Sequence, residues 1–247
     1  MKITLALAVL AASAATAAHA QDFGIAGREF SVDLGVGADI GPDYPGSEDA
    51  EAGPWLIWRN AGFGQPGTNE AEGFALSPSF GTVGEREASD NPELAGLADL
   101  DRAYELGLRV SYGTGPLTTS ASVRRGFDGH EGLTGELGAR YRTDLSDRVS
   151  LWSGLSLGYG NDDYNDTYFG VDGPQAAPGR PAYDIGGGFN KAAVTFEARY
   201  ALTENTALLG EVEYARLIGD AADSPLVQDR NQPSIKLGIV RRFSFGF

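Results

Sequence analysis

Apolar and polar residues alternate with a period of two along most of this chain. In residues 30–40, one face of an extended segment carries Phe30, Val32, Leu34, Val36, Ala38 and Ile40, and the other carries Ser31, Asp33, Gly35, Gly37 and Asp39. Segments of about ten residues with one apolar and one polar face are typical of strands in an outer-membrane β-barrel. The strands of a secreted soluble β-sandwich, the alternative, also alternate but are usually only about 5–6 residues long. The pattern therefore predicts an all-β fold, a transmembrane antiparallel up-and-down β-barrel of the outer membrane.

Aromatic residues support the membrane interpretation, because barrels carry aromatic girdles at both interfaces. Many of them lie at the ends of the expected strands, namely Phe30, Tyr104, Tyr112, Phe127, Tyr141, Tyr159, Tyr200 and Tyr214. The last segment carries Phe243, Phe245 and Phe247, and a terminal Phe after an alternating strand resembles the C-terminal signal that outer-membrane assembly machinery reads.

The strand number follows from a parity argument. Eleven alternating segments can be identified, at 30–40, 53–60, 73–83, 103–112, 116–126, 132–143, 148–160, 182–190, 192–202, 205–215 and 233–247. Both ends of such a barrel lie in the periplasm, with the short turns on that side, so the number of strands is even. The short turns at 145–147 and 203–205 enclose three of these segments, where an even number is required. A further strand is therefore expected at 163–171, giving about 12 strands, within a range of 10–12.

The N-terminus has the form of a secretory signal peptide. Lys2 precedes an apolar run over 3–10, and Ala18-His19-Ala20 forms a small-residue cleavage site. We expect residues 1–20 to be cleaved, 21–29 to form a short periplasmic segment and 30–247 to form a single barrel domain. No later stretch is apolar for about 20 residues, so no transmembrane helix is expected.

Composition excludes several classes of function. The chain contains no cysteine, which excludes a disulfide framework, a thiolate metal site and a cysteine nucleophile. It has 34 acidic and 19 basic side chains, with a formal net charge of −15. Nucleic acid is bound through Lys and Arg on phosphates, so no nucleic-acid partner is expected.

Charges on the polar faces of the strands are nearly balanced. The expected lumen acids are Asp33, Asp39, Glu105, Glu136, Asp184, Glu197, Glu211 and Glu213, and the expected lumen bases are Arg109, Arg124, Arg140, Arg142, Arg199, Lys236 and Arg242. Opposite charges on neighbouring strands can pair, which favours a salt-bridged filling over a narrow selective channel. The excess acid falls in the expected outer loops. Solvated loops are the preferred interpretation there, and divalent cations bridging to lipopolysaccharide are the alternative.

No motif in the chain supports catalysis. Residues 154–158 match G-x-S-x-G, but that motif needs a strand-to-helix elbow and Ser156 falls inside an expected strand. His130 lies in a short loop and is expected to be a turn residue. We predict no enzyme activity, no catalytic residue, no cofactor and no metal site.

An ordered set of segments resembles the MipA/OmpV family of outer-membrane proteins. A signature loop after the first strand contains Pro42, Tyr44, Gly46 and Ser47, and a second signature segment contains Tyr164, Asn165, Thr167, Tyr168, Phe169 and Gly170. Similar segments occur at 94–101, 123–132 and 224–227, so the resemblance covers nearly the whole mature chain.

The resemblance implies a non-enzymatic barrel of the outer membrane. The member that names the family is a scaffold that links a lytic murein transglycosylase to a murein synthase, while other members are adhesin-like or porin-like. The implied partners are those two enzymes, together with outer-membrane lipid, lipopolysaccharide and the assembly machinery. Whether the signature loop binds a ligand or is a Pro/Gly turn is left open, with the turn preferred.

Overall fold

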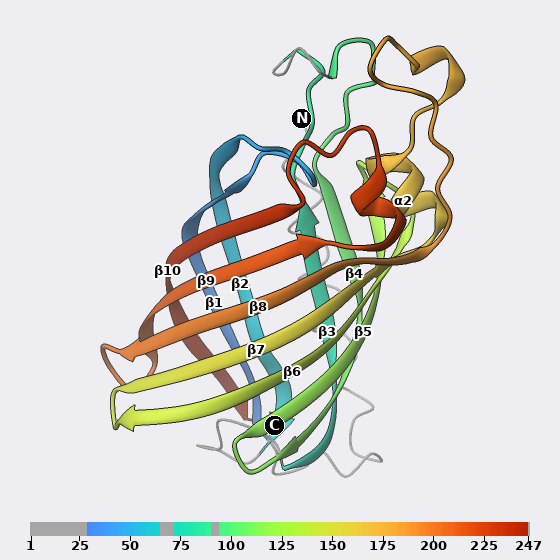
Figure 1. Cartoon of the computed structure of the whole chain (residues 1–247). Helices are drawn as coiled ribbons and strands as arrows, with labels where there is room; N and C mark the ends of the chain where they lie inside the picture. The colour runs from blue at the N-terminus through green and yellow to red at the C-terminus, as the bar shows by residue number, and fades with distance from the viewer. Residues whose placement is uncertain (1–28, 65–71, 90–93, 247) are drawn as a thin grey trace, which may run out of the picture.

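The computed structural model describes residues 29–64, 72–89 and 94–246 of the chain. They form one antiparallel sheet in the order β2-β1-β10-β9-β8-β7-β6-β5-β4-β3, which curls into a barrel (Figure 1). The strands are β1 Glu29–Pro42, β2 Ala50–Gly64, β3 Gly73–Val83, β4 Ala103–Thr114, β5 Leu117–Asp128, β6 Leu133–Ser146, β7 Val149–Gly160, β8 Gly188–Ala201, β9 Thr206–Leu217 and β10 Asn231–Gly246. The predicted all-β antiparallel barrel fold is confirmed.

The strands are longer than those of ordinary soluble sheets. Their apolar side chains face outward and their polar side chains face inward, the reverse of a soluble protein. Large apolar side chains such as Leu56, Leu76 and Leu237 are exposed on the outer face, whereas Asp33 and Glu105 are buried on the inner face. This arrangement matches a lipid-facing outer surface around a polar interior.

The described residues contain ten strands, which lies within the expected range of 10–12 but below twelve. The strand expected at 163–171 is wrong, because residues Asp162–Phe169 form the helix α2. Asn161 caps this helix by accepting a hydrogen bond from the Tyr164 backbone N–H, and acids occupy its first turn. Both features favour a helix N-terminus, and they outweigh the short aromatic alternation.

The strand expected at 182–190 is also wrong for most of its length. One strand, β8, begins at Gly188 and includes the segment predicted from 192 onward. The residues before it belong to a loop, where Ile185 is buried and Asp184 is exposed, so Asp184 is not a lumen acid. With both changes the number of strands in the described residues remains even, and the two short turns predicted at 145–147 and 203–205 lie at the same end of the barrel.

The first strand, β1, pairs with the last strand, β10, and glycines allow their backbones to approach closely. Gly37 pairs with Gly238, and a Cβ atom on Gly37 would overlap the carbonyl oxygen of Leu237. The opposite edges of the sheet, β2 and β3, are neighbours as well, because the rings of Trp58 and Phe80 lie 4.9 Å apart.

The long connections pack into a loop cap at the other end of the barrel, comprising 43–49, 84–89, 94–102, 161–187 and 218–230 (Figure 1). Within it lie α2 and two short 3₁₀ helices, η3 Gly173–Gln175 and η4 Gly219–Asp223. The cap has two buried apolar clusters, one made of Tyr44, Leu94, Leu97, Val171 and Leu226, the other of Tyr168, Phe169, Ile185, Leu217, Ala221 and Ala222. The acidic side chains of the same connections, among them Glu48, Asp99 and Asp163, are exposed. No helix in the described residues is long and apolar enough to cross a membrane.

Candidate functional site

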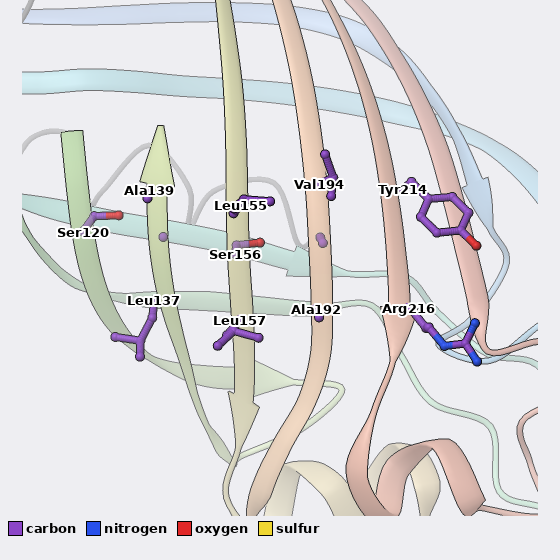
Figure 2. Close-up of a pocket in the computed structure, with 12 residues that line it drawn as sticks. Ser120, Leu137, Ala139, Leu155, Ser156, Leu157, Ala192, Val194, Tyr214 and Arg216 are labelled. Carbon is purple, nitrogen blue, oxygen red and sulfur yellow. The ribbon is translucent and has the colours of Figure 1, made fainter. Parts of the chain in front are cut away.

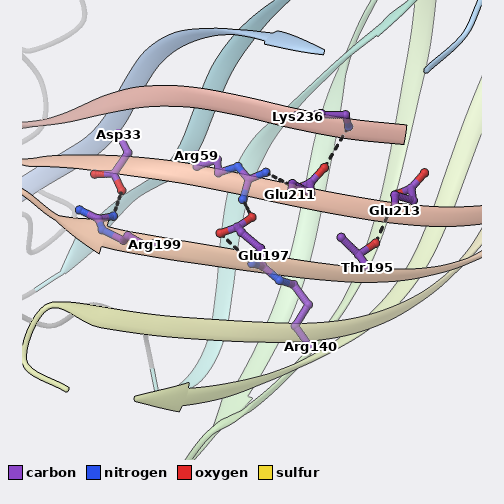
Figure 3. Close-up of polar contacts among 9 residues, drawn as sticks. All are labelled: Asp33, Arg59, Arg140, Thr195, Glu197, Arg199, Glu211, Glu213 and Lys236. Carbon is purple, nitrogen blue, oxygen red and sulfur yellow. Dashed lines mark hydrogen bonds and ion pairs between the residues drawn. The ribbon is translucent and has the colours of Figure 1, made fainter. Parts of the chain in front are cut away.

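The most buried charge of the inner face is the carboxylate of Asp33 on β1, which is 2% exposed (Figure 3). Arg242 on β10 donates to it from Nε at 2.8 Å and from Nη2 at 3.2 Å. Arg199 on β8 donates from Nη1 at 3.0 Å. One carboxylate thus ties three strands together, which is the satisfied state that a buried charge requires.

A second set of ion pairs crosses the interior itself. Arg59 on β2 pairs with Glu197 on β8 and donates from Nη2 to Glu211 on β9 at 2.7 Å (Figure 3). Lys236 on β10 reaches Glu211 at 2.9 Å, and Arg140 on β6 reaches Glu197 at 3.4 Å. Because β2 and β8 are four places apart in the sheet order, Arg59 spans the lumen rather than joining neighbours.

An apolar plug, defined as Ile57, Ala207, Leu209 and Val240, fills the inner face beside these ion pairs. These side chains come from β2, β9 and β10 and are all buried. Trp55 packs against the plug, and its ring lies 5.4 Å from the Arg59 guanidinium and 5.9 Å from the Lys236 amine. The interior here is therefore packed rather than open.

A third polar cluster lies where the barrel meets the loop cap. Arg124 on β5 donates from Nε to Glu105 on β4 at 2.7 Å. Nε2 of His130 lies 3.4 Å from the same carboxylate. The imidazole is completely buried, and Gly126 leaves space for it, since a Cβ atom there would overlap the ring. His130 is therefore a packed residue and not an exposed turn residue.

The second signature segment covers this cluster. The rings of Tyr164 and Tyr168 on α2 lie edge-on to His130, at 5.0 and 5.6 Å. Burial raises the pKa of both phenols, so both stay protonated. Asn165 is buried and ties α2 to the start of β8, donating to the Gly186 carbonyl at 2.9 Å and accepting from Asn190 at 2.9 Å.

The remaining residues of that segment have local roles within the cap. Thr167 donates to the Asp163 carbonyl at 2.6 Å, and the backbone N–H of Gly170 closes the helix on Asp166. Phe169 is buried in the cap, where its carbonyl accepts from the Ser224 hydroxyl at 2.6 Å.

The first signature loop is a turn locked against the β9–β10 connection. Tyr44 and Ser47 are buried, and the Ser47 backbone N–H donates to the Tyr44 carbonyl at 2.9 Å. Gly46 adopts a positive φ of 102°, donates to Gln232 Oε1 at 3.0 Å and accepts from the Gln228 backbone N–H at 2.8 Å. The signature loop, which begins at Pro42 on the end of β1, holds two distant loops together.

The other residues singled out in the sequence lie outside these clusters. Arg109 and Glu136 pair at 3.2 Å and are partly exposed on the inner face. Phe243 and Phe245 face outward, with Phe245 stacked 6.5 Å from Phe30, whereas Phe247 lies outside the described residues. Ser156 lies within β7, paired with Gly138 and Ala193, and not at an elbow.

Two arginines that make buried polar contacts, Arg59 and Arg86, were not identified from the sequence. Arg59 belongs to an alternating segment whose polar face includes Trp55 and Ile57, so it did not count among the lumen bases. Arg86 is buried in the cap and donates to the Tyr168 carbonyl at 3.4 Å, and no periodic pattern surrounds it. Among residues 29–64, 72–89 and 94–246, no group of three or more His, Asp or Glu side chains is arranged to hold a metal ion.

The sequence of the strands and of the loop cap matches that of a known protein family. The family model described as MltA-interacting protein MipA matches residues 34–243. The chain belongs to the MipA family. The match begins within β1, ends within β10 and covers all the strands between them, and both signature segments lie in the loop cap of this MipA-family barrel.

Two curated relatives are outer-membrane proteins of vibrios. Omp26La of Vibrio anguillarum is 34% identical over 34% of this chain and 32% of its own length. OmpV of Vibrio cholerae is 36% identical over 31% of this chain and 29% of its own length. The matched part thus spans about a third of each relative. The family and these relatives place the chain in the outer membrane, and none of their names denotes an enzyme.

Solved structures that the chain resembles weakly include a β-barrel domain and a surface protein. The N-terminal β-barrel domain of Pseudomonas aeruginosa OprF aligns at a TM-score of 0.36 and 14% identity, covering 70% of this chain and 100% of that one. Neisserial surface protein A aligns at a TM-score of 0.32 and 14% identity, covering 87% of this chain and 97% of that one.

Removal of the Asp33 carboxylate is predicted to destabilise the barrel strongly. Asp33→Ala leaves two partly buried guanidinium groups without their shared partner, which costs about 3 kcal/mol of unfolding free energy, the lower end for a broken buried pair. Asp144→Ala is the matched control, because Asp144 is exposed and its pairing with Arg142 is worth less than about 1 kcal/mol. Urea unfolding in lipid vesicles, followed by tryptophan fluorescence, measures both. Equal effects of the two substitutions would contradict the assignment.

Proposed function

We propose that this chain is a closed, non-enzymatic barrel that acts as a scaffold or interaction protein in the cell envelope. The observation that supports the proposal most directly is Arg59, which crosses the interior to Glu197 and Glu211 beside the apolar plug. An interior filled in this way stabilises the barrel and leaves its ends as the surfaces available for function.

The proposed partners are a lytic murein transglycosylase and a murein synthase. The family description, MltA-interacting protein, supports the first of these. Murein lies in the periplasm, and at that end the barrel presents short turns with exposed charges, including Asp147 and Glu204. These turns are the proposed contact points.

Biogenesis forms part of the same proposal. Residues 1–20 are a cleaved signal peptide, residues 21–29 a short periplasmic segment and 30–247 a single barrel; the assembly machinery reads the terminal set of Phe243, Phe245 and Phe247. Residues 1–28 and Phe247 lie outside the described residues. Outer-membrane lipid and lipopolysaccharide surround the barrel.

A narrow channel is the second candidate function. Half-exposed ion pairs support it, because Lys191 with Glu213 and Arg109 with Glu136 present charge that water could reach on the inner face. A solute path along them would still have to pass the plug and the Arg59 ion pairs.

Bilayer recording distinguishes the two candidates. The wild-type protein is expected to show little steady conductance, because the plug and the Arg59 ion pairs obstruct the lumen. The combined variant Ile57→Ala, Leu209→Ala, Val240→Ala and Arg59→Ala removes both the plug and the ion pairs that cross the lumen, and should open a measurable conductance. A steady wild-type conductance unchanged in this variant would overturn the closed-barrel proposal in favour of a channel.

Co-purification tests the partner. A murein transglycosylase should co-purify with the tagged barrel from detergent-solubilised membranes, and Asp147→Lys combined with Glu204→Lys should reduce the yield of the enzyme several-fold. The matched control is Glu87→Lys, which reverses an exposed charge at the cap end instead. Repeated absence of the enzyme from wild-type preparations would contradict the scaffold role.

A further inference from the structure

The outer face of β6 to β9 contains a hollow of about 590 Å³ (Figure 2). Ala139 and Ala192 leave it open, because they stand among the larger side chains Leu155, Leu157 and Val194. Most of the side chains that line it, such as Leu155 at 63% exposure, face outward, so the hollow lies mainly on the lipid side, while the inward-facing Ser120 and Ser156 also contribute to its lining. It is the size of a site for a hydrocarbon chain.

A cation lies at the end of the hollow nearest the loop cap. Arg216, the penultimate residue of β9, lines the hollow and is the register partner of Ala192 (Figure 2). It is exposed, and it donates to Asn231 Oδ1 at 3.1 Å. No carboxylate of the described residues lies within ion-pairing distance of its guanidinium, which keeps further donors available.

The aromatic girdle fixes the depth of Arg216 in the membrane. Tyr159 and Phe189 pack edge-to-face at 5.9 Å near the cap end of β7 and β8, and Tyr214 is two residues before Arg216 on the same outward face. Such aromatic residues lie at the level of the headgroups. Arg216 therefore reaches the polar headgroups of the outer leaflet, on the side of the long loops.

We propose that Arg216 and the hollow form a binding site for lipid A, a phosphorylated and multiply acylated lipid of the outer leaflet. One acyl chain occupies the hollow, and a phosphate accepts charge-assisted hydrogen bonds from Arg216. The site thus selects for a lipid whose phosphate and acyl chain are a fixed distance apart. This selectivity distinguishes it from the contact that any membrane lipid makes with the barrel.

Charge complementarity favours this lipid over a second copy of the barrel. The lipid-facing positions of the described strands carry Arg125, Arg216 and Arg241 and no acidic residue. A second barrel packed on this face would offer no carboxylate to Arg216, whereas lipid A brings phosphates.

A second hollow on the outer face provides an internal comparison. It measures about 450 Å³ and is lined by Phe196, Ala198, Gly210 and Val212 among other residues, with no outward-facing charge. It is equally apolar but lacks a cation, so it should not select for a phosphorylated lipid.

Native mass spectrometry of the detergent-solubilised protein tests the site, with folding of each variant first checked by heat-modifiable gel mobility. Bisphosphorylated lipid A should remain bound, and Arg216→Ala should weaken binding about tenfold. Arg241→Ala, an outward arginine at the periplasmic end, should leave binding unchanged. Ala192→Leu fills the hollow and should weaken binding, whereas Gly210→Leu, which fills the second hollow, should not.

Three outcomes would overturn the proposal. They are equal binding by the Arg216→Ala and Arg241→Ala variants, equal binding of dephosphorylated lipid A, and retention of lipid A by Ala192→Leu accompanied by loss of a barrel dimer. The last of these would assign the hollow to a second copy of the chain.

Discussion

Burial of charge inside a membrane-embedded barrel is the constraint on which the rest of this structure depends. A carboxylate such as Asp33 cannot remain ionised away from water without cations at hydrogen-bonding distance, and Arg199 and Arg242 supply them from two other strands. Arg59 likewise neutralises the carboxylates of Glu197 and Glu211 from the opposite side of the lumen. The requirement for paired charges therefore also determines which strands must be neighbours, and the resulting ion pairs fill part of the interior.

The barrel could be predicted from the sequence because its governing pattern is local. Alternation along each strand indicates which side chains face lipid. The register between β1 and β10 then places Asp33 opposite Arg242. Strand number and the position of Arg59 could not be predicted in this way. The contact of Arg59 with Glu197 depends on curvature of the whole sheet, and α2 was hidden because Tyr164 and Tyr168 fit both periods. The Asn161 cap was the available signal.

The residues that resemble the family signature lie mainly in the loop cap, away from the ion pairs of the lumen. Gly46 joins its loop to the β9–β10 connection through Gln228, Asn165 ties together the two ends of the β7–β8 connection, and His130 packs against α2. These segments therefore hold the loop cap together at one end of the barrel. Charge in the loops gives the chain its acidity, while the lipid-facing surface of the described strands is charged only by arginine.

Because the chain has no cysteine, single introduced thiols can report directly on whether the lumen is closed. Val240→Cys places a thiol in the apolar plug, and Glu204→Cys places one on an exposed periplasmic turn. The measurement is the rate of labelling by a water-soluble maleimide in lipid vesicles. A closed interior predicts rapid labelling at position 204 and none at position 240 until the barrel is unfolded. Labelling of both thiols at similar rates would contradict the account.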